Sequence, residues 1–242
     1  MQASFYFHGD ISQLLRPRWR SLYPIVQPVT RAASIKDVIE SFGPPHTEIG
    51  AITCNGQPVD FSWPVNTGQR FDFFPVTPPW DVTRPTLLRP NPLPGLGFIV
   101  DINVGRLARY LRMAGFDTLY ETTWEMQDIL RTVQQEQRIL LTRNLDLLKR
   151  KQVVFGRAIR ANTPAEQLRE VLDLFGFAQP PHPLSRCLEC NGLLEPVPKE
   201  KILHRLEPLT TRYFDAFYLC RRCDHIYWAG SHADRMRLTL FG

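Results

Sequence analysis

Four polar side chains follow hydrophobic runs or open helices in the stretch from residue 97 to residue 150. Asp101 and Asn144 come at or just after short apolar runs, Asp146 lies two residues beyond Asn144, and Asp128 lies on the intervening helical segment. Carboxylate and amide oxygens are the ligands that Mg²⁺ and Mn²⁺ prefer. Metal ions held in this way can activate water for phosphodiester cleavage. The residue types therefore predict a divalent-metal site made by Asp101, Asp128 and Asp146 with help from Asn144.

Each of these residues also has a plainer interpretation. Asp101 or the nearby Asn103 can cap the helix that follows, and Asp146 can cap the next one. Asp128 can be a solvated helix residue. Asn144 carries no negative charge, so we expect weaker metal affinity than an Asp at this position would give.

The surrounding elements decide whether these side chains can meet. The run 98–100 predicts a strand, and apolar residues at i, i+3, i+4 and i+7 between 104 and 114 predict a helix. A second helix near 126–133 and a second strand at 138–142 follow. Strands that alternate with helices predict a parallel sheet. Ligands of such sheets bind beyond the carboxyl ends of the strands, where Asp101 and Asn144 fall.

A basic surface is predicted beside this edge. Residues 97–160 hold eleven Lys or Arg against seven Asp or Glu, in a chain of net charge +5. A 3.6-residue period places three arginines on the polar side of the first helix, and further cations flank the second cluster. Such groups fit contacts to a phosphate backbone, although an arginine face can equally be solvated surface. The candidate nucleic-acid ligands are Arg106, Arg109, Arg112, Arg143, Lys149 and Arg150.

Two Cys-x-x-Cys pairs predict a second metal site. Cys187 and Cys190 form one pair, and Cys220 and Cys223 form the other. Two such knuckles complete a tetrahedral four-thiolate site for Zn²⁺, and a full ligand set indicates a structural role. The residues between the pairs exceed the usual ribbon spacing, and we expect an inserted hairpin or loop there.

The N-terminal part predicts a separate α+β domain. Strands near 3–8 and 22–29, a helix capped by Ser34 and ended by Gly43, an Asn55-Gly56 hairpin turn and a strand near 70–76 follow one another. This order is that of a ubiquitin-like (β-grasp) fold. Prolines in the second strand place it at a sheet edge. Residues 77–95 contain six prolines and predict a semi-rigid, extended linker.

From residue 97 to the C-terminus the chain resembles the Mut-seven C-terminal RNase domain family. That resemblance implies a PIN-like α/β nuclease domain with a zinc ribbon, RNA as substrate, and a ubiquitin-like domain in front. The family usually has Asp where this chain has Asn144. The resemblance rests on the segments 98–101, 105–112, 115–118, 139–143 and 227–232.

We therefore expect four parts: a ubiquitin-like domain at 1–76, a linker at 77–95, a PIN-like domain at 96–179 and a zinc-ribbon module at 180–242. The expected function is metal-dependent RNA hydrolysis, with Zn²⁺ as structural and Mg²⁺ or Mn²⁺ as catalytic metal. The alternatives are a non-catalytic RNA- or ribosome-binding protein with a decayed site, and an adaptor whose ubiquitin-like domain binds a protein. The N-terminus lacks the pattern of a signal peptide and no long apolar run exists, so we expect a cytoplasmic protein without membrane contact.

Overall fold

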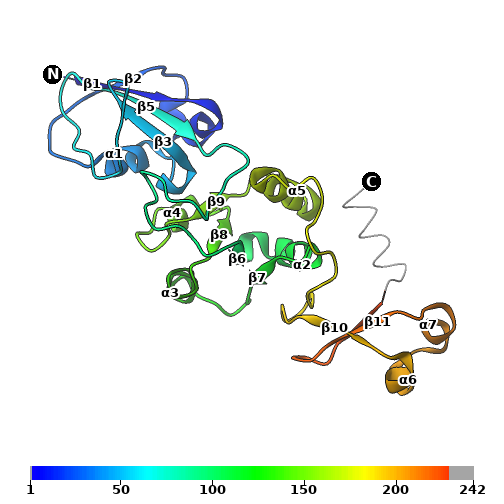
Figure 1. The fold of residues 1–242 in the computed structure, drawn as a ribbon. Coiled ribbons are helices and arrows are strands. Elements are labelled where there is room, and N and C mark those ends of the chain that lie inside the picture. The colour runs from blue at the N-terminus through cyan, green and yellow to red at the C-terminus, as the bar shows by residue number, and fades with distance from the viewer. Residues whose placement is uncertain (1, 229–242) are drawn as a thin grey trace.

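The computed structural model describes residues 2–228. Figure 1 shows three bodies in chain order: a blue-to-cyan N-terminal domain, a green to yellow-green central domain and a yellow-to-orange C-terminal module. The fold is the expected one, a parallel-sheet α/β domain preceded by a β-grasp domain and followed by a ribbon. No helix among these residues is long and apolar enough to cross a membrane.

The N-terminal domain is a five-stranded mixed sheet with one main helix. The strand order is β2-β1-β5-β3-β4, with β1 parallel to β5 and the other pairs antiparallel. The edge position predicted for β2 is confirmed. The strands are β1 (Gln2–Phe7), β2 (Ile25–Pro28), β3 (Ile49–Cys54), β4 (Gln57–Pro58) and β5 (Arg70–Pro75), and the helices are α1 (Ile35–Phe42), η1 (Gly9–Leu14), η2 (Pro17–Trp19) and η3 (His46–Glu48).

Local sequence signals set the limits of these elements. The Ser34 side chain accepts a hydrogen bond from the Asp37 backbone at the start of α1, and Gly43 ends the helix with a φ of 134°. A Cβ on Gly43 would lie 2.5 Å from the Leu14 carbonyl oxygen, so a side chain has no room there. Asn55 and Gly56 have φ values of 50° and 82° and form the predicted hairpin turn.

The central domain is a four-stranded, fully parallel sheet with the order β7-β6-β8-β9. Helices cover both faces, as parallel sheets require. The sequence reasoning did not foresee β7, a strand of only three residues. The elements are β6 (Gly97–Val100), η4 (Ile102–Val104), α2 (Gly105–Met113), β7 (Asp117–Leu119), α3 (Met126–Glu136), β8 (Ile139–Thr142), α4 (Leu145–Leu148), β9 (Gly156–Ala158) and α5 (Pro164–Phe175).

The two faces of this sheet pack against different helices. Phe98 and Val100 join the core that contains residues of α2 and α5, whereas Ile99 between them joins the core that contains residues of α3 and α4. In β8, Leu140 and Leu141 alternate in the same way. This alternation with a period of two places each continuous apolar strand between two helix layers.

The C-terminal module is a three-stranded antiparallel sheet with the order β10-β11-β12. Short helices fill the long spacing between the two cysteine pairs, where we expected a hairpin or loop. The elements are β10 (Leu194–Val197), α6 (Lys199–Ile202), η5 (Leu203–Arg205), α7 (Pro208–Tyr213), β11 (Phe217–Cys220) and β12 (Ile226–Trp228).

The proline-rich segment between β5 and β6 packs against both domains. The Trp80 ring stacks on Phe175 of α5 with the ring centroids 5.8 Å apart. Buried Arg89 donates to the backbone oxygens of Ile49 (2.9 Å) and Thr47 (2.8 Å) in the N-terminal domain and of Val154 (3.3 Å) in the central domain. Burial lowers the pKa of Arg89 to about 10. The segment therefore joins the two domains as a strap.

Charged side chains complete this contact between domains. Glu48 of η3 is fully buried and forms ion pairs with Arg157 (2.8 Å) and Arg160 (3.1 Å). It also accepts a 2.7 Å hydrogen bond from the Ala158 backbone of β9. Asp10 pairs with the same two arginines. The ubiquitin-like domain thus covers the edge strand β9.

Candidate functional site

The site lies at the carboxyl-end edge of the parallel sheet. Strands β6 and β8 are neighbours, and Val100 lies opposite Leu141. Asp101 and Thr142, the next residue of each strand segment, therefore come together at one edge. A 2.7 Å hydrogen bond from the Thr142 hydroxyl to Asp101 Oδ2 joins them.

Asp101 is a buried carboxylate, with 4% of its surface exposed. It caps η4 by accepting a 3.1 Å hydrogen bond from the Asn103 backbone at Oδ1, and it accepts a 2.8 Å bond from Asn103 Nδ2 at Oδ2. The Asn144 backbone N–H donates to the Thr142 hydroxyl at 2.8 Å. A continuous hydrogen-bonded line therefore runs from Asn144 through Thr142 to Asp101.

Asn144 has a local structural role as the N-cap of α4. Its Oδ1 accepts from the backbone N–H groups of Asp146 (3.0 Å) and Leu147 (3.2 Å). The side chain of Asp146 is 83% exposed and pairs with Lys149 at 3.1 Å. The sequence interpretation had left a capping role open for Asp146. The structure assigns that role to Asn144.

Asp128 lies in the first turn of α3, which begins after the carboxyl end of β7. It forms a capping box with Glu125, whose backbone N–H donates to Asp128 Oδ2 at 3.1 Å. Its other oxygen pairs with Arg131 at 2.5 Å. Asp128 thus starts a helix at the same edge of the sheet, and its carboxylate is used locally.

Among the described residues, Asp101, Asp128 and Asp146 do not form a metal-binding cluster. Within residues 2–228, the four cysteines are the one group of three or more Cys, His, Asp or Glu side chains arranged to hold an ion. Mg²⁺ commonly takes one or two protein carboxylates and completes its shell with water and substrate phosphates. One buried carboxylate with flanking acids fits this mode of binding, in which water and phosphate complete the shell. It does not fit a site in which the protein supplies every ligand.

The predicted arginine face divides into two exposed residues and one buried residue. Arg106 and Arg109 are exposed, and Arg109 pairs with Glu189 at 3.2 Å. Arg112 is only 4% exposed. Its guanidinium donates to the carbonyl oxygens of Thr118 (2.9 Å), Leu188 (3.0 Å) and Glu189 (2.6 Å).

The expectation that Arg112 contacts nucleic acid is therefore corrected. The last turn of α2 lies against β7 and the first cysteine pair, and these neighbours enclose the side chain. Arg112 fastens the cysteine module to the central domain. Burial lowers its pKa below the ordinary value.

The remaining cations lie beyond β8. Arg143 is exposed, and its guanidinium donates to the Ala161 carbonyl and to Asn162 Oδ1, which brings it to the end of β9. Lys149 is held by Asp146, and Arg150 is exposed. Arg143 directly follows β8 and Arg106 lies in the first turn of α2, so these two exposed arginines lie at the carboxyl-end edge of the sheet, whereas Arg150 lies beyond the end of α4, next to Lys151.

The four cysteine sulfurs converge on one point. All lie within 4.8 Å of one another, with Cys187 and Cys223 at 3.4 Å and Cys190 and Cys220 at 3.4 Å. Zn–S bonds of about 2.3 Å in a tetrahedron place the sulfurs about 3.8 Å apart, so the donor set fits Zn²⁺. The Tyr227 hydroxyl lies 3.1 Å from Cys187 Sγ and orients that ligand.

Sequence reasoning missed the part played by Thr142 in the site. Its strand is otherwise built from large aliphatic residues, and it is itself fully buried. A hydroxyl at the last position of a buried strand requires a partner, and this was the available signal. Arg112 carried no comparable signal, because two of its three partners, Leu188 and Glu189, lie more than seventy residues away in the chain.

Comparison with known proteins completes the description of the site. A family model described as the Mut7-C RNAse domain matches residues 96–240, and a second, described as Mut7-C ubiquitin, matches residues 1–81. Comparisons with curated proteins and with solved structures gave no match.

Proposed function

Because the chain belongs to the Mut7-C RNAse domain family, we propose that it is a metal-dependent ribonuclease that hydrolyses RNA phosphodiester bonds at the Asp101 edge of the sheet. The observation that supports this proposal is the buried Asp101 carboxylate, held at the end of β6 by Thr142 and Asn103. Burying a carboxylate costs free energy, and among residues 2–228 hydrogen bonds, without an ion pair, offset this cost for Asp101.

Each residue of the edge has a proposed task. Thr142 and Asn103 fix the orientation of Asp101, and Asp128 and Asp146 supply further carboxylates from the first turns of α3 and α4. Mg²⁺ or Mn²⁺ bound at this edge would supply an activated water and would stabilise charge on phosphate oxygens. Arg106, Arg109, Arg143 and Arg150 would bind the phosphate backbone, because they are exposed cations on several segments of the same domain.

Two exposed apolar side chains near Asp101 and α3 could contact the substrate as well. Ile102 directly follows Asp101 and is 68% exposed, and Met126 at the start of α3 is also exposed. We propose that these side chains contact the sugar or base of the substrate. Single-stranded RNA exposes the faces of unstacked bases, which these apolar side chains could contact.

A second candidate function is RNA or ribosome binding without catalysis. The observation that favours it is Asn144, whose amide oxygen already accepts two backbone hydrogen bonds as a helix cap. A site that has lost its catalytic metal would keep a residue such as Asn144, which caps a helix and carries no negative charge. In that case the arginines would still bind RNA.

The substitution Asn144→Asp separates the two candidates. Asp caps helices as well as Asn does, so α4 should remain intact. If the protein is a ribonuclease with one neutral ligand, the variant should bind Mn²⁺ more tightly and cleave RNA faster. If neither wild type nor variant cleaves RNA while both bind it, the non-catalytic function is the correct one.

Two further proposals concern the ubiquitin-like domain and the cell compartment. We propose that the domain, besides covering β9, offers its free surface to a protein partner, and that the protein acts in the cytoplasm. Pull-down with the full chain and with a variant altered in the exposed bend before β2, such as Tyr23→Ala, would test the first point. Tyr23 is 64% exposed, so its loss should spare the fold.

A further inference from the structure

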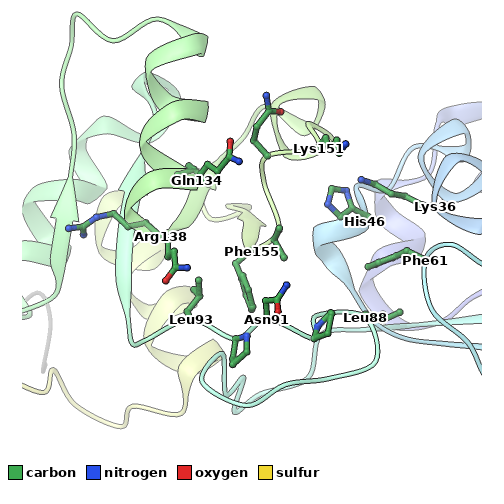
Figure 2. Close-up of a pocket in the computed structure, with 16 residues that line it drawn as sticks. Lys36, His46, Phe61, Leu88, Asn91, Leu93, Gln134, Arg138, Lys151 and Phe155 are labelled. Atoms are coloured by element: carbon green, nitrogen blue, oxygen red, sulfur yellow. The ribbon is translucent and has the colours of Figure 1, made fainter.

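A cavity of about 400 Å³ lies where the ubiquitin-like domain, the proline-rich strap and the central domain meet (Figure 2). Each of the three parts contributes to its lining. The ubiquitin-like domain supplies Phe61, the strap supplies Asn91, and the central domain supplies Gln134 and Phe155. Pockets of this size at domain interfaces commonly hold small ligands.

The cavity is separate from the Asp101 site. Arg138 and Phe155 line it, and each directly precedes a strand of the parallel sheet. Asp101 instead directly follows β6, and Asn144 lies two residues beyond the end of β8. Since parallel strands all begin at one edge and end at the other, the cavity and the candidate catalytic site lie at opposite edges of the sheet.

The lining is cationic and contains no carboxylate. Lys36 and Lys151 contribute positive charge from two different domains. Within the described part of the chain, neither lysine has an ion pair. Figure 2 shows both near His46 at one end of the cavity, whereas the Arg138 guanidinium points away toward Asp117 and Glu136, its partners in ion pairs.

The remaining walls combine flat rings with amide groups. Figure 2 shows Phe61 and Phe155 facing the space between the domains. Four amide side chains line the same cavity and have no hydrogen-bond partner among residues 2–228: Asn91, Gln134, Gln137 and Gln152. Amides both donate and accept, so they can pair with the edge of a nucleobase. Aromatic rings accept any base by stacking.

We propose that this cavity binds a nucleoside monophosphate, with the phosphate at Lys36 and Lys151 and the base among the aromatic rings and amides. Lysines bind phosphate as point charges. The proposal goes beyond the proposed RNA cleavage, because it concerns a second site at the other edge of the sheet. A ligand bound there contacts both domains and the strap, so it should stabilise their association.

Isothermal titration of the full chain with AMP, GMP, CMP and UMP tests the proposal. At least one nucleotide should bind with a Kd below about 1 mM. Substituting both Lys36→Ala and Lys151→Ala should weaken that binding by at least about tenfold. The matched control, Lys199→Ala with Lys201→Ala on the distant α6, should leave binding unchanged.

Three further titrations show whether the nucleotide binds in this cavity and which of its groups are recognised. Asp101→Asn should bind the nucleotide as the wild type does, which separates this site from the proposed nuclease site. Inorganic phosphate and the free nucleoside should each bind more weakly than the nucleotide. The proposal would be overturned by no nucleotide binding, by equal binding to the double-lysine variant, by loss of binding in Asp101→Asn, or by phosphate binding as tightly as the nucleotide.

Discussion

The Thr142 hydroxyl donates a 2.7 Å hydrogen bond to the buried Asp101 carboxylate and accepts one of 2.8 Å from the Asn144 backbone. One side chain thus links the ends of two neighbouring strands. It sets the position of the acid on which the proposed chemistry depends, in the way that hydrogen-bonded neighbours commonly orient metal-binding carboxylates.

Replacing Thr142 by Val should test this relationship. The two side chains have the same shape, but Val cannot donate to Asp101, which should cost about 1–3 kcal/mol in the free energy of unfolding. RNA cleavage should fall as well. Thr118→Val is the matched control, because it removes another fully buried hydroxyl, which bonds to the Phe116 carbonyl. If both variants lose stability but neither loses cleavage, Thr142 serves the fold alone.

The contact between the first two domains should depend on Glu48. Glu48→Gln leaves Arg157 and Arg160 without their buried partner. Breaking a buried ion pair from one side costs about 3–5 kcal/mol. Urea unfolding followed by circular dichroism measures this change. Glu195→Gln, which removes one side of the exposed pair with Arg221, should cost no more than about 1 kcal/mol. Equal effects of the two substitutions would contradict the interdomain role of Glu48.

The attachment of the cysteine module should depend on Arg112 and on zinc. Arg112→Lys keeps the charge but loses the planar set of donors that reaches three carbonyl oxygens. We expect a stability loss of at least about 1.5 kcal/mol and faster release of zinc to a chelator. Arg109→Lys, on the exposed side of the same helix, should change neither quantity measurably. A stable Arg112→Lys variant with weakened RNA binding would restore the original expectation for this residue.

Acid should loosen the same attachment through Asp117. Burial opposes its ionisation, but hydrogen bonds from Arg138 and Asn191 and the charges of Arg138 and Arg186 together hold its pKa below the usual value of 3.8. A lowered folded-state pKa means stabilisation that is full above the unfolded value and is lost as the pH falls through the folded one. The difference in the free energy of unfolding between wild type and Asp117→Asn should therefore shrink as the pH is lowered from about 6 to about 2. A constant difference over this range would contradict the account.

Periodicity and capping signals predicted most of the elements. Ser34 begins α1 and Gly43 ends it as expected, and Thr163 and Gly176 limit α5 in the same way. These features are local, because a cap needs only the neighbouring backbone. The parallel central sheet followed from alternating strands and helices, although β7 was too short to be recognised.

Features that depend on distant partners could not be predicted in this way. Arg112 lies on the polar side of a helical wheel, yet the cysteine module encloses it. The segment at residues 77–95 has the composition of a linker, yet Trp80 and Arg89 pack into both domains. Whether the acids would converge was also open, because sequence indicates an edge of a sheet but not the direction of each carboxylate.

The most direct test of the central claim is RNA cleavage by the purified full chain with Mn²⁺, compared with Asp101→Asn. The account predicts cleavage that needs the metal and falls by at least about a hundredfold in the variant. Asp173→Asn, an exposed acid on α5, should cleave as the wild type does. The metal-free control contains EDTA in place of Mn²⁺. Because EDTA also removes zinc, the fold must be checked by circular dichroism in that control. Equal cleavage by Asp101→Asn, or no cleavage alongside RNA binding that weakens with salt, would contradict the claim.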